Sequence, residues 1–325
     1  MSTGLRCLLT TYSSAFLRSG GGEFELVQVC ETLTSGGIEA DLYGPRSRPL
    51  EFYDAVMHFS IHPDGYSLLE AVRSKGKKIL LWPNIWWQDK ASVNDVAVAL
   101  KFVRLADHLL FKSKTEMLNF LANIPEAECK SFVLPIPLPK HYDTIDLSLA
   151  KTVVGYDSYI LCVGRVEPIK NQLQAVAISK NLGIPLVMLG GVGDVAYFEQ
   201  CKKYGGNSVS LLPAVQPRSL LLYSLYAACK AVIEVSFDPP GRSCLEAALL
   251  HKPVLMNAGS WSDEFFANDA YLFSDNVCES KHDIAARWID DLDLKSEAAY
   301  IRVLENHCSE KVLEGFIEDI TDAIV

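Results

Sequence analysis

The chain reads Tyr159-Ile160-Leu161-Cys162-Val163-Gly164-Arg165-Val166-Glu167-Pro168-Ile169-Lys170, an apolar run followed by a loop with two cations. A second apolar run, Ala231-Val232-Ile233-Glu234-Val235, leads into Ser236-Phe237-Asp238-Pro239-Pro240-Gly241-Arg242-Ser243-Cys244-Leu245-Glu246-Ala247. Each stretch predicts a buried strand, then a loop, then a helix. In an open parallel sheet such loops gather at one edge, where ligands bind. We therefore expect both loops to line one binding site.

The residue types in these loops favour a diphosphate and sugar hydroxyls as ligands. Arg165 can bind phosphate oxygens through two hydrogen bonds, and Lys170 adds a second positive charge. Asp238 and Glu246 flank a glycine turn ahead of a helix N-terminus, which favours anions. Structural interpretations stay open, because the cations can be solvated, Asp238 suits a turn, and Ser243 with Glu246 matches a capping box.

Strand and helix signals alternate along the whole chain, which predicts an α/β fold with parallel sheets wrapped by helices. In the first half we expect helices at 23–35, 66–73 and 93–105, and strands at 5–10, 38–43, 54–59, 78–82 and 108–111. In the second half we expect helix from 281 to the end, and strands at 159–163, 185–189, 209–212, 231–235 and 253–257.

Alternate prolines in Leu134-Pro135-Ile136-Pro137-Leu138-Pro139 interrupt this rhythm, because proline continues neither a helix nor a central strand. We expect a first domain over 1–140, a linker over 141–157 and a second domain over 158–300. A last helix over 301–325 could pack back on the first domain.

Composition excludes several classes of protein. The chain has 325 residues, is 49% hydrophobic and carries a net charge of −10, with the whole excess of acidic residues in its second half. Nucleic-acid binding needs a basic footprint and is not expected. The nine cysteines show no C-x-x-C pair and no zinc spacing, and neither a membrane span nor a signal-peptide pattern is found. We expect a reduced, cytoplasmic protein without a metal.

The first half offers weaker candidates. Gly20-Gly21-Gly22 precedes the first helix, so amides at Gly21 and Gly22 can bind an anion, or the run is only a flexible loop. It lacks the G-x-G-x-x-G spacing, which makes a nicotinamide oxidoreductase the least favoured class. His58 and His62 flank a strand end and can hydrogen-bond a ligand or serve the structure.

Asn84, Trp86 and Trp87 follow the strand expected at 78–82. The indole rings can stack on sugars of an acceptor, or they can fill a packing gap. Arg73, Lys75, Lys77 and Lys78 form the densest basic cluster, which indicates a solvated turn or, alternatively, contact with an anionic membrane surface or a lipid diphosphate.

Taken in this order, these motifs resemble those of family 4 glycosyltransferases, a retaining group with the GT-B fold of two Rossmann-like domains facing across a cleft. The resemblance covers most of the chain. It is weak in the first half, where it rests on Gly20–Gly22 and on Ala106-Asp107-His108 leading to Ser113-Lys114-Thr115-Glu116. It is strong from Val163 to Asn171 and from Ser236 to Ala247, and His251-Lys252-Pro253-Val254 matches the next turn.

The resemblance implies a role for each matched residue. Arg165 and Lys170 would neutralise the diphosphate of a nucleotide sugar, in place of a metal or other cofactor. Glu246 would bind the ribose, and Asp238 the donor sugar. Amides of Gly241, Arg242 and Ser243 would bind sugar or phosphate.

Three departures from the family pattern affect donor choice. Asp238 replaces the usual Glu, Pro240 replaces a Phe, and Arg242 replaces an apolar residue. Asn84 also stands where a cleft histidine is usual, which leaves His58 or His62 as substitutes.

The expected function is transfer of a sugar, with retention, from a nucleotide diphosphate to an acceptor hydroxyl. The acceptor would be a carbohydrate or a glycolipid, and the enzyme could sit peripherally on the inner face of a membrane. Alternatives are a GT-B epimerase, a phosphorylase, or a non-catalytic protein that binds nucleotide sugars.

Overall fold

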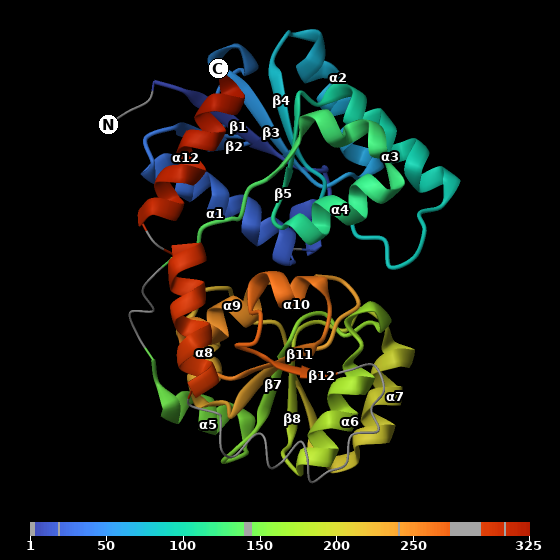
Figure 1. Cartoon of the computed structure of the whole chain (residues 1–325), viewed down its shortest axis with the longest axis vertical. Coiled ribbons are helices and arrows are strands. Elements are labelled where there is room, and N and C mark those ends of the chain that lie inside the picture. Colours follow the sequence, from blue (N-terminus) through green and yellow to red (C-terminus); the bar gives the residue numbers. More distant parts are fainter. Residues whose placement is uncertain (1–3, 19, 140–144, 240, 274–293, 309) are drawn as a thin grey trace. The chain divides into compact units, whose positions relative to one another are not determined.

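The computed structural model describes residues 4–18, 20–139, 145–239, 241–273, 294–308 and 310–325. Contacts divide the chain into two compact units, one made of residues 1–138 and 307–325, the other of residues 139–306. Each unit is built on a parallel sheet with helices packed against it (Figure 1). The α/β fold class predicted from the alternating pattern is confirmed.

The sheet of the first unit has the strand order β2-β1-β3-β4-β5-β6, and all its described pairs are parallel. Its strands are β1 (Arg6–Thr10), β2 (Glu39–Leu42), β3 (Ala55–Phe59), β4 (Lys78–Trp82), β5 (His108–Phe111) and β6 (Ser131–Val133). The strand order reverses beside β1, so the segments after β1 and β3 lie at the switch point of this sheet.

Two apolar clusters cover the two faces of this sheet, because alternate residues of each strand point to opposite sides. One face packs against α1 (Gly21–Ser35) and α12 (Glu310–Ile324). The other packs against α2 (Tyr66–Ser74), α3 (Val93–Leu105) and α4 (Lys114–Asn123). The last helix of the chain thus belongs to the first unit, where Phe316 and Ile320 are buried among residues of α1, β3 and β4.

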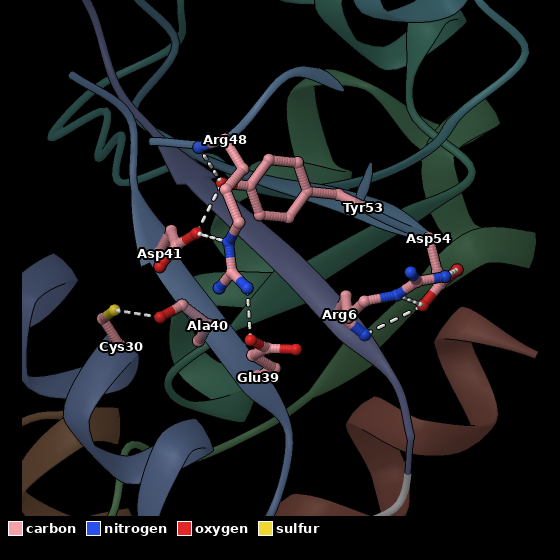
Figure 2. Close-up of polar contacts among 8 residues, drawn as sticks. All are labelled: Arg6, Cys30, Glu39, Ala40, Asp41, Arg48, Tyr53 and Asp54. Carbon is pink, nitrogen blue, oxygen red and sulfur yellow. Dashed lines mark hydrogen bonds and ion pairs between the residues drawn. The ribbon is translucent and has the colours of Figure 1, made fainter. Parts of the chain in front are cut away.

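The connection between β2 and β3 contains only the short turn Leu50–Phe52, and charged side chains hold it in place (Figure 2). Arg48 pairs with Glu39 and donates from Nε to Asp41 Oδ2 at 2.9 Å. Its guanidinium also stacks 3.8 Å from the centre of the Phe52 ring. Tyr53 donates to Asp41 at 2.6 Å, so one carboxylate ties both ends of the segment to β2.

The sheet of the second unit has the order β12-β11-β10-β7-β8-β9, and its described pairs are again parallel. Its strands are β7 (Ile160–Val163), β8 (Leu186–Leu189), β9 (Val209–Leu212), β10 (Ala231–Glu234), β11 (Val254–Asn257) and β12 (Tyr271–Phe273). Among its described helices are α5 (Leu147–Val154), α6 (Gln172–Leu182), α7 (Val195–Gly205), α8 (Leu220–Ala228), α9 (Arg242–Leu249) and α10 (Ser260–Phe265). Here the switch point lies between β7 and β10.

Some elements differ from the sequence-based expectation. Strands β6 and β12 were not predicted, because three residues are too few to show an alternating pattern. The segment expected as a linker over 141–157 holds α5, whose N-cap Asp146 accepts hydrogen bonds from the amides of Ser148 and Leu149. The helix expected from 281 lies partly outside the described residues, and it is helical over 294–303.

Candidate functional site

The two loops quoted first meet at the carboxyl ends of β7 and β10, which are neighbours in the second sheet. The amide of Phe237 donates to the carbonyl of Ile169 at 2.9 Å, so the backbones of the two loops are joined directly. This contact explains how residues far apart in the sequence come to share one edge. Lys170 and Asp238 are the pair that it brings together.

Lys170 donates from Nζ to Asp238 Oδ2 at 2.6 Å, and both side chains are about three-quarters buried. Burial acts to lower the pKa of Lys170, but the carboxylates of Glu234 and Asp238 outweigh it, so the net shift is upward. Lys170 therefore stays charged at the edge of the sheet. Asp238 Oδ1, the other oxygen of this carboxylate, is buried without a hydrogen-bond partner among the described residues.

A third carboxyl group, Glu234, lies beside this ion pair and was missed as a site residue in the sequence. It is the last residue of β10, is buried, and accepts a hydrogen bond from the amide of Ser236 at 3.2 Å. Burial raises the pKa of Glu234 to about 7, with Lys170 lowering it and Asp238 raising it. The sequence did carry one signal, since an acid inside an apolar strand is rarely left without a function or a partner.

Arg165 differs from Lys170 because its side chain is exposed. Its carbonyl accepts a hydrogen bond from Gln172 Nε2 at 2.9 Å, which fixes the backbone of the loop. Within the described part of the chain, no ion pair or hydrogen bond engages its guanidinium. Its charge is therefore available to an anionic ligand.

Glu246 is held by two side chains rather than by the helix end. Its Oε1 accepts from Arg242 at 3.3 Å, and its Oε2 accepts from Tyr226 at 3.2 Å. Burial raises the pKa of Glu246, and the charge of Arg242 offsets only part of this rise. The carboxylate belongs to the fifth residue of α9, in the second turn of the helix.

The capping box predicted for Ser243 and Glu246 is wrong. α9 begins at Arg242 and its N-cap is Gly241, which is extended and offers no side-chain cap. Ser243 is therefore the second residue of the helix and Glu246 is the fifth, two positions beyond the third position that a capping box requires. The extended glycine starts the helix two residues earlier than a cap at Ser243 would. Gly241 and Ser243 nonetheless remain at the helix N-terminus, where backbone amides have no acceptor within the helix.

Several buried polar atoms at this edge have no hydrogen-bond partner among the described residues. They are Ser236 Oγ, which follows β10, Asn257 Oδ1, which ends β11, and Asp238 Oδ1. Buried polar atoms are nearly always satisfied in folded proteins. Their presence on neighbouring strands is consistent with a ligand that carries several hydroxyl groups.

In the first unit, Glu23 occupies the start of α1. Its Oε2 accepts from the amide of Gly20 at 2.7 Å, and its Oε1 accepts from the hydroxyl of Tyr12 at 3.0 Å. Gly21 and Gly22 are the first two residues of the helix. Since a carboxylate already lies at this N-terminus, these amides favour a neutral polar ligand over a second anion.

His58 and His62 have different environments. His58 is fully buried, its Nδ1 lies 2.8 Å from Thr10 Oγ1, and burial lowers the pKa of His58 to about 4. Its ring stacks on Phe102 of α3, so His58 serves the packing of β3 in this structure. His62 is partly exposed and stacks on Tyr12, with 4.4 Å between the ring centres. Of the two, His62 lies nearer to solvent and to the segment that follows β1.

Asn84, Trp86 and Trp87 also lie in different environments. Asn84 has a positive φ of 46°, and its Nδ2 lies 4.0 Å from the position that a Cβ on Gly22 would take. Both polar atoms of its side chain are buried without a partner among the described residues. Trp87 stacks on Phe120, and its backbone amide and carbonyl exchange hydrogen bonds with the side-chain amide of Asn119, which fixes it against the core of the first unit. Trp86 is half-buried and stays a candidate for the acceptor.

Partners already surround the basic cluster. Arg73 pairs with Asp107 at 2.9 Å, Lys77 donates to the carbonyl of Tyr53 at 2.5 Å, and Lys75 lies 3.7 Å from Glu51. These contacts favour a structural role over a membrane surface site. None of the described helices is both long and apolar enough to cross a membrane. Nor do three or more His, Cys, Asp or Glu side chains gather as a metal site in the part of the chain that the structure describes.

No family model and no curated protein matches this chain in sequence. Solved structures do match over nearly its whole length. HepE from Anabaena, in complex with UDP and glucose, has a TM-score of 0.72 at 15% identity and covers 98% of this chain and 99% of its own. The sucrose-phosphate synthase of Thermosynechococcus elongatus has a TM-score of 0.74 at 14% identity, with 98% of each chain covered.

The chain has the GT-B fold. A glycosyltransferase from Rickettsia africae agrees with this assignment, with a TM-score of 0.71, 16% identity, and 98% of this chain and 99% of its own covered. The fold predicted from the resemblance is thereby confirmed. At such low identities the likeness establishes architecture, and the chemistry must be argued from the site itself.

Proposed function

We propose that this protein is a retaining, metal-independent glycosyltransferase that moves a sugar from a nucleotide diphosphate to an acceptor hydroxyl. The observation that carries the proposal is the Lys170–Asp238 pair at 2.6 Å, at the switch point of the second sheet and ahead of the N-terminus of α9. Cations, paired acids and a helix start at one sheet edge suit a ligand with both phosphates and hydroxyls.

The two cations have one role in the proposed reaction, which is to bind the diphosphate. Arg165 and Lys170 neutralise the diphosphate and the charge that grows on it as the bond between the anomeric carbon and the phosphate oxygen breaks. Fixed cations perform the role that a metal ion plays in other transferases. Activity is therefore expected to survive a chelator.

The acids recognise the donor. Asp238 keeps one buried oxygen, Oδ1, for hydroxyls of the sugar, since Oδ2 is bound to Lys170. Glu246 accepts hydrogen bonds from the ribose with the lone pairs that Arg242 and Tyr226 leave. The acceptor hydroxyl forms its bond to the anomeric carbon on the face that the diphosphate leaves, and its proton passes to the departing phosphate oxygen. Attack on that face retains the configuration.

The structural neighbours support the choice of donor class. HepE was solved with UDP and, in another crystal, with UDP-glucose. AviGT4, with a TM-score of 0.68, is named as a glycosyltransferase of avilamycin A biosynthesis. UDP-sugars are thus the first donors to test. The acceptor is proposed to be a carbohydrate or glycolipid that meets His62, Asn84 and Trp86 of the first unit.

The test is a thermal-shift screen with UDP-, GDP-, ADP- and dTDP-sugars, because a ligand that binds only the folded state must raise its stability. At about one hundred times the dissociation constant the gain is about 2.7 kcal/mol. Donors that bind are then incubated with acceptors, with and without chelator, and the product anomer is assigned by NMR.

Arg165→Ala is the decisive variant. Loss of donor binding and of turnover supports the proposal, and unchanged binding and turnover refute it. A sugar isomerised without an acceptor would identify an epimerase instead. Consumption of phosphate would identify a phosphorylase, and tight binding with no transfer to any acceptor would identify a binding protein.

A further inference from the structure

The loop that follows β8 packs directly on the loop that carries Arg165. The amide of Val166 donates to the carbonyl of Gly191 at 2.9 Å, and the amides of Gly193 and Asp194 both donate to the carbonyl of Val166 at 3.0 Å. The two backbones are therefore joined at Val166, the residue that follows Arg165. Nothing in the sequence-based assignment gave this second loop a role.

Gly193 lies under the side chain of Arg165. A Cβ built on Gly193 would lie 2.7 Å from Cδ and 2.9 Å from Cγ of Arg165, and 3.0 Å from Oε2 of Glu167. Its φ lies outside the left-handed region, so glycine is needed here for space and not for backbone conformation. The aliphatic stem of Arg165 thus rests where any other residue would place a side chain.

We infer that Gly193 is a positioning residue, which sets the direction from which Arg165 presents its guanidinium to the donor diphosphate. The inference rests on the proposed function, since it concerns the same site. The guanidinium is exposed, and no described side chain orients it. Contact between its stem and the backbone at Gly193 is what limits its rotamers.

A methyl group at this position is expected to turn Arg165 aside rather than unfold the protein. The two nearest contacted atoms belong to Arg165, an exposed and flexible side chain that can change rotamer, and the third is a terminal oxygen of Glu167. The guanidinium then loses its charge-assisted hydrogen bonds to phosphate. Loss of such bonds corresponds to roughly 10- to 100-fold weaker binding.

The neighbouring glycines supply matched variants. A Cβ on Gly191 meets nothing within 4 Å, and its φ also lies outside the left-handed region, so Gly191→Ala is the neutral control. A Cβ on Gly190 would lie 2.0 Å from the carbonyl oxygen of Gly164, and its φ is +159°. Gly190→Ala is therefore expected to destabilise the second unit. Its lowered melting temperature would mark a structural effect, in contrast to the loss of nucleotide affinity alone that is expected for Gly193→Ala.

The experiment titrates UDP, GDP, ADP and dTDP into the wild type and into G193A, G191A, R165A and the double variant G193A/R165A. G193A is expected to weaken the nucleotide that the wild type binds by 10- to 100-fold, with an unchanged melting temperature, while G191A matches the wild type. In the R165A background G193A is expected to have no further effect, because the two residues act through one contact. With a donor sugar, kcat is expected to fall together with affinity.

Three results would overturn the inference. In the first, G193A binds as the wild type does although R165A is impaired. In the second, G193A weakens binding equally in both backgrounds, which would trace its effect to Glu167 or to the loop. In the third, the wild type binds none of the four nucleotides, which would remove the proposed function as well. The first two leave the proposed function standing.

Discussion

Glu234→Gln tests whether the buried carboxyl at the end of β10 controls the stability of the second unit. The pKa of Glu234 rises from its ordinary value of 4.5 to about 7, because burial disfavours its charged form. Gln keeps an oxygen for the amide of Ser236, which now donates to Glu234 at 3.2 Å. The substitution therefore removes the titration and preserves the shape.

The sign and the size of the expected pH dependence of stability follow from the difference in the pKa of Glu234 between the folded and the unfolded chain. An acid whose pKa is raised by folding holds a proton that the unfolded chain has already released. Its stabilising contribution is full below pH 4.5 and is lost as the pH rises through about 7. A pKa that rises from 4.5 to about 7 on folding corresponds to a loss of about 3 kcal/mol in the free energy of unfolding at high pH.

Gln is neutral at every pH and Glu234 is neutral below its pKa, so the variant removes a charge only over the range in which Glu234 ionises. The attraction of Lys170 for that charge is already contained in the pKa of about 7. Asp238, at 2.6 Å, is the partner of Lys170 whether or not Glu234 is charged. The pH-dependent part of the difference between the two proteins therefore isolates Glu234.

Hydrogen exchange of peptides from β7 and β10 is the suitable assay. The chain has two compact units, so a single unfolding transition for the whole protein is not assured, whereas exchange reports the local free energy of opening. Relative to the variant, the free energy of opening of the wild type is expected to fall by about 3 kcal/mol between about pH 4.5 and pH 8, after correction for intrinsic exchange. Glu199→Gln, at an exposed carboxyl on α7, is the control. An equal difference at both ends of this range would refute the reasoning.

Two further predictions concern the first unit. Arg48→Ala is expected to lower the melting temperature more at neutral pH than near pH 3, because the hydrogen bond from Arg48 lowers the pKa of Asp41 and that stabilisation is lost as pH falls through the lowered value; a drop that is the same at both pH values would contradict this. Gly65→Ala is expected to destabilise by about 1–3 kcal/mol in urea unfolding, because its Cβ would lie 2.7 Å from Nε2 of the buried His58, whereas Gly44→Ala, with open space around it, should leave stability unchanged.

The sequence predicted the edge of the second sheet well because parallel strands bring their carboxyl ends to one side. That rule alone put Lys170 and Asp238 together, and the structure joins them at 2.6 Å. The rule does not give the direction of a side chain at a strand end. The sequence therefore left His58 open between a ligand-binding and a structural role, whereas the structure shows that the pleat of β3 turns it against Phe102.

Other features depend on a shift of two residues in a helix start or on contacts between distant loops. The capping box failed because α9 starts at Arg242, two residues before the start that a cap at Ser243 gives. Glu234 was read as part of an apolar strand, and only the neighbouring strands show how deeply it is buried. Gly193 could not be interpreted at all, since a glycine in a sequence does not reveal which side chain lies over it.

The distribution of charge at this edge bears on how a donor would bind. Lys170 is already paired with Asp238 and Arg242 with Glu246, so these four groups nearly cancel in pairs. Arg165 has no such partner among the described residues, and Glu234 changes its charge near neutral pH. Under the proposed function, a diphosphate therefore gains its first attraction from Arg165, while Lys170 can strengthen its contact only by sharing its protons between phosphate and Asp238. A residue that fixes the direction of Arg165 is then expected to affect donor affinity more than one that only adds charge. Gly193 is such a residue, because its lack of a side chain leaves room for the stem of Arg165.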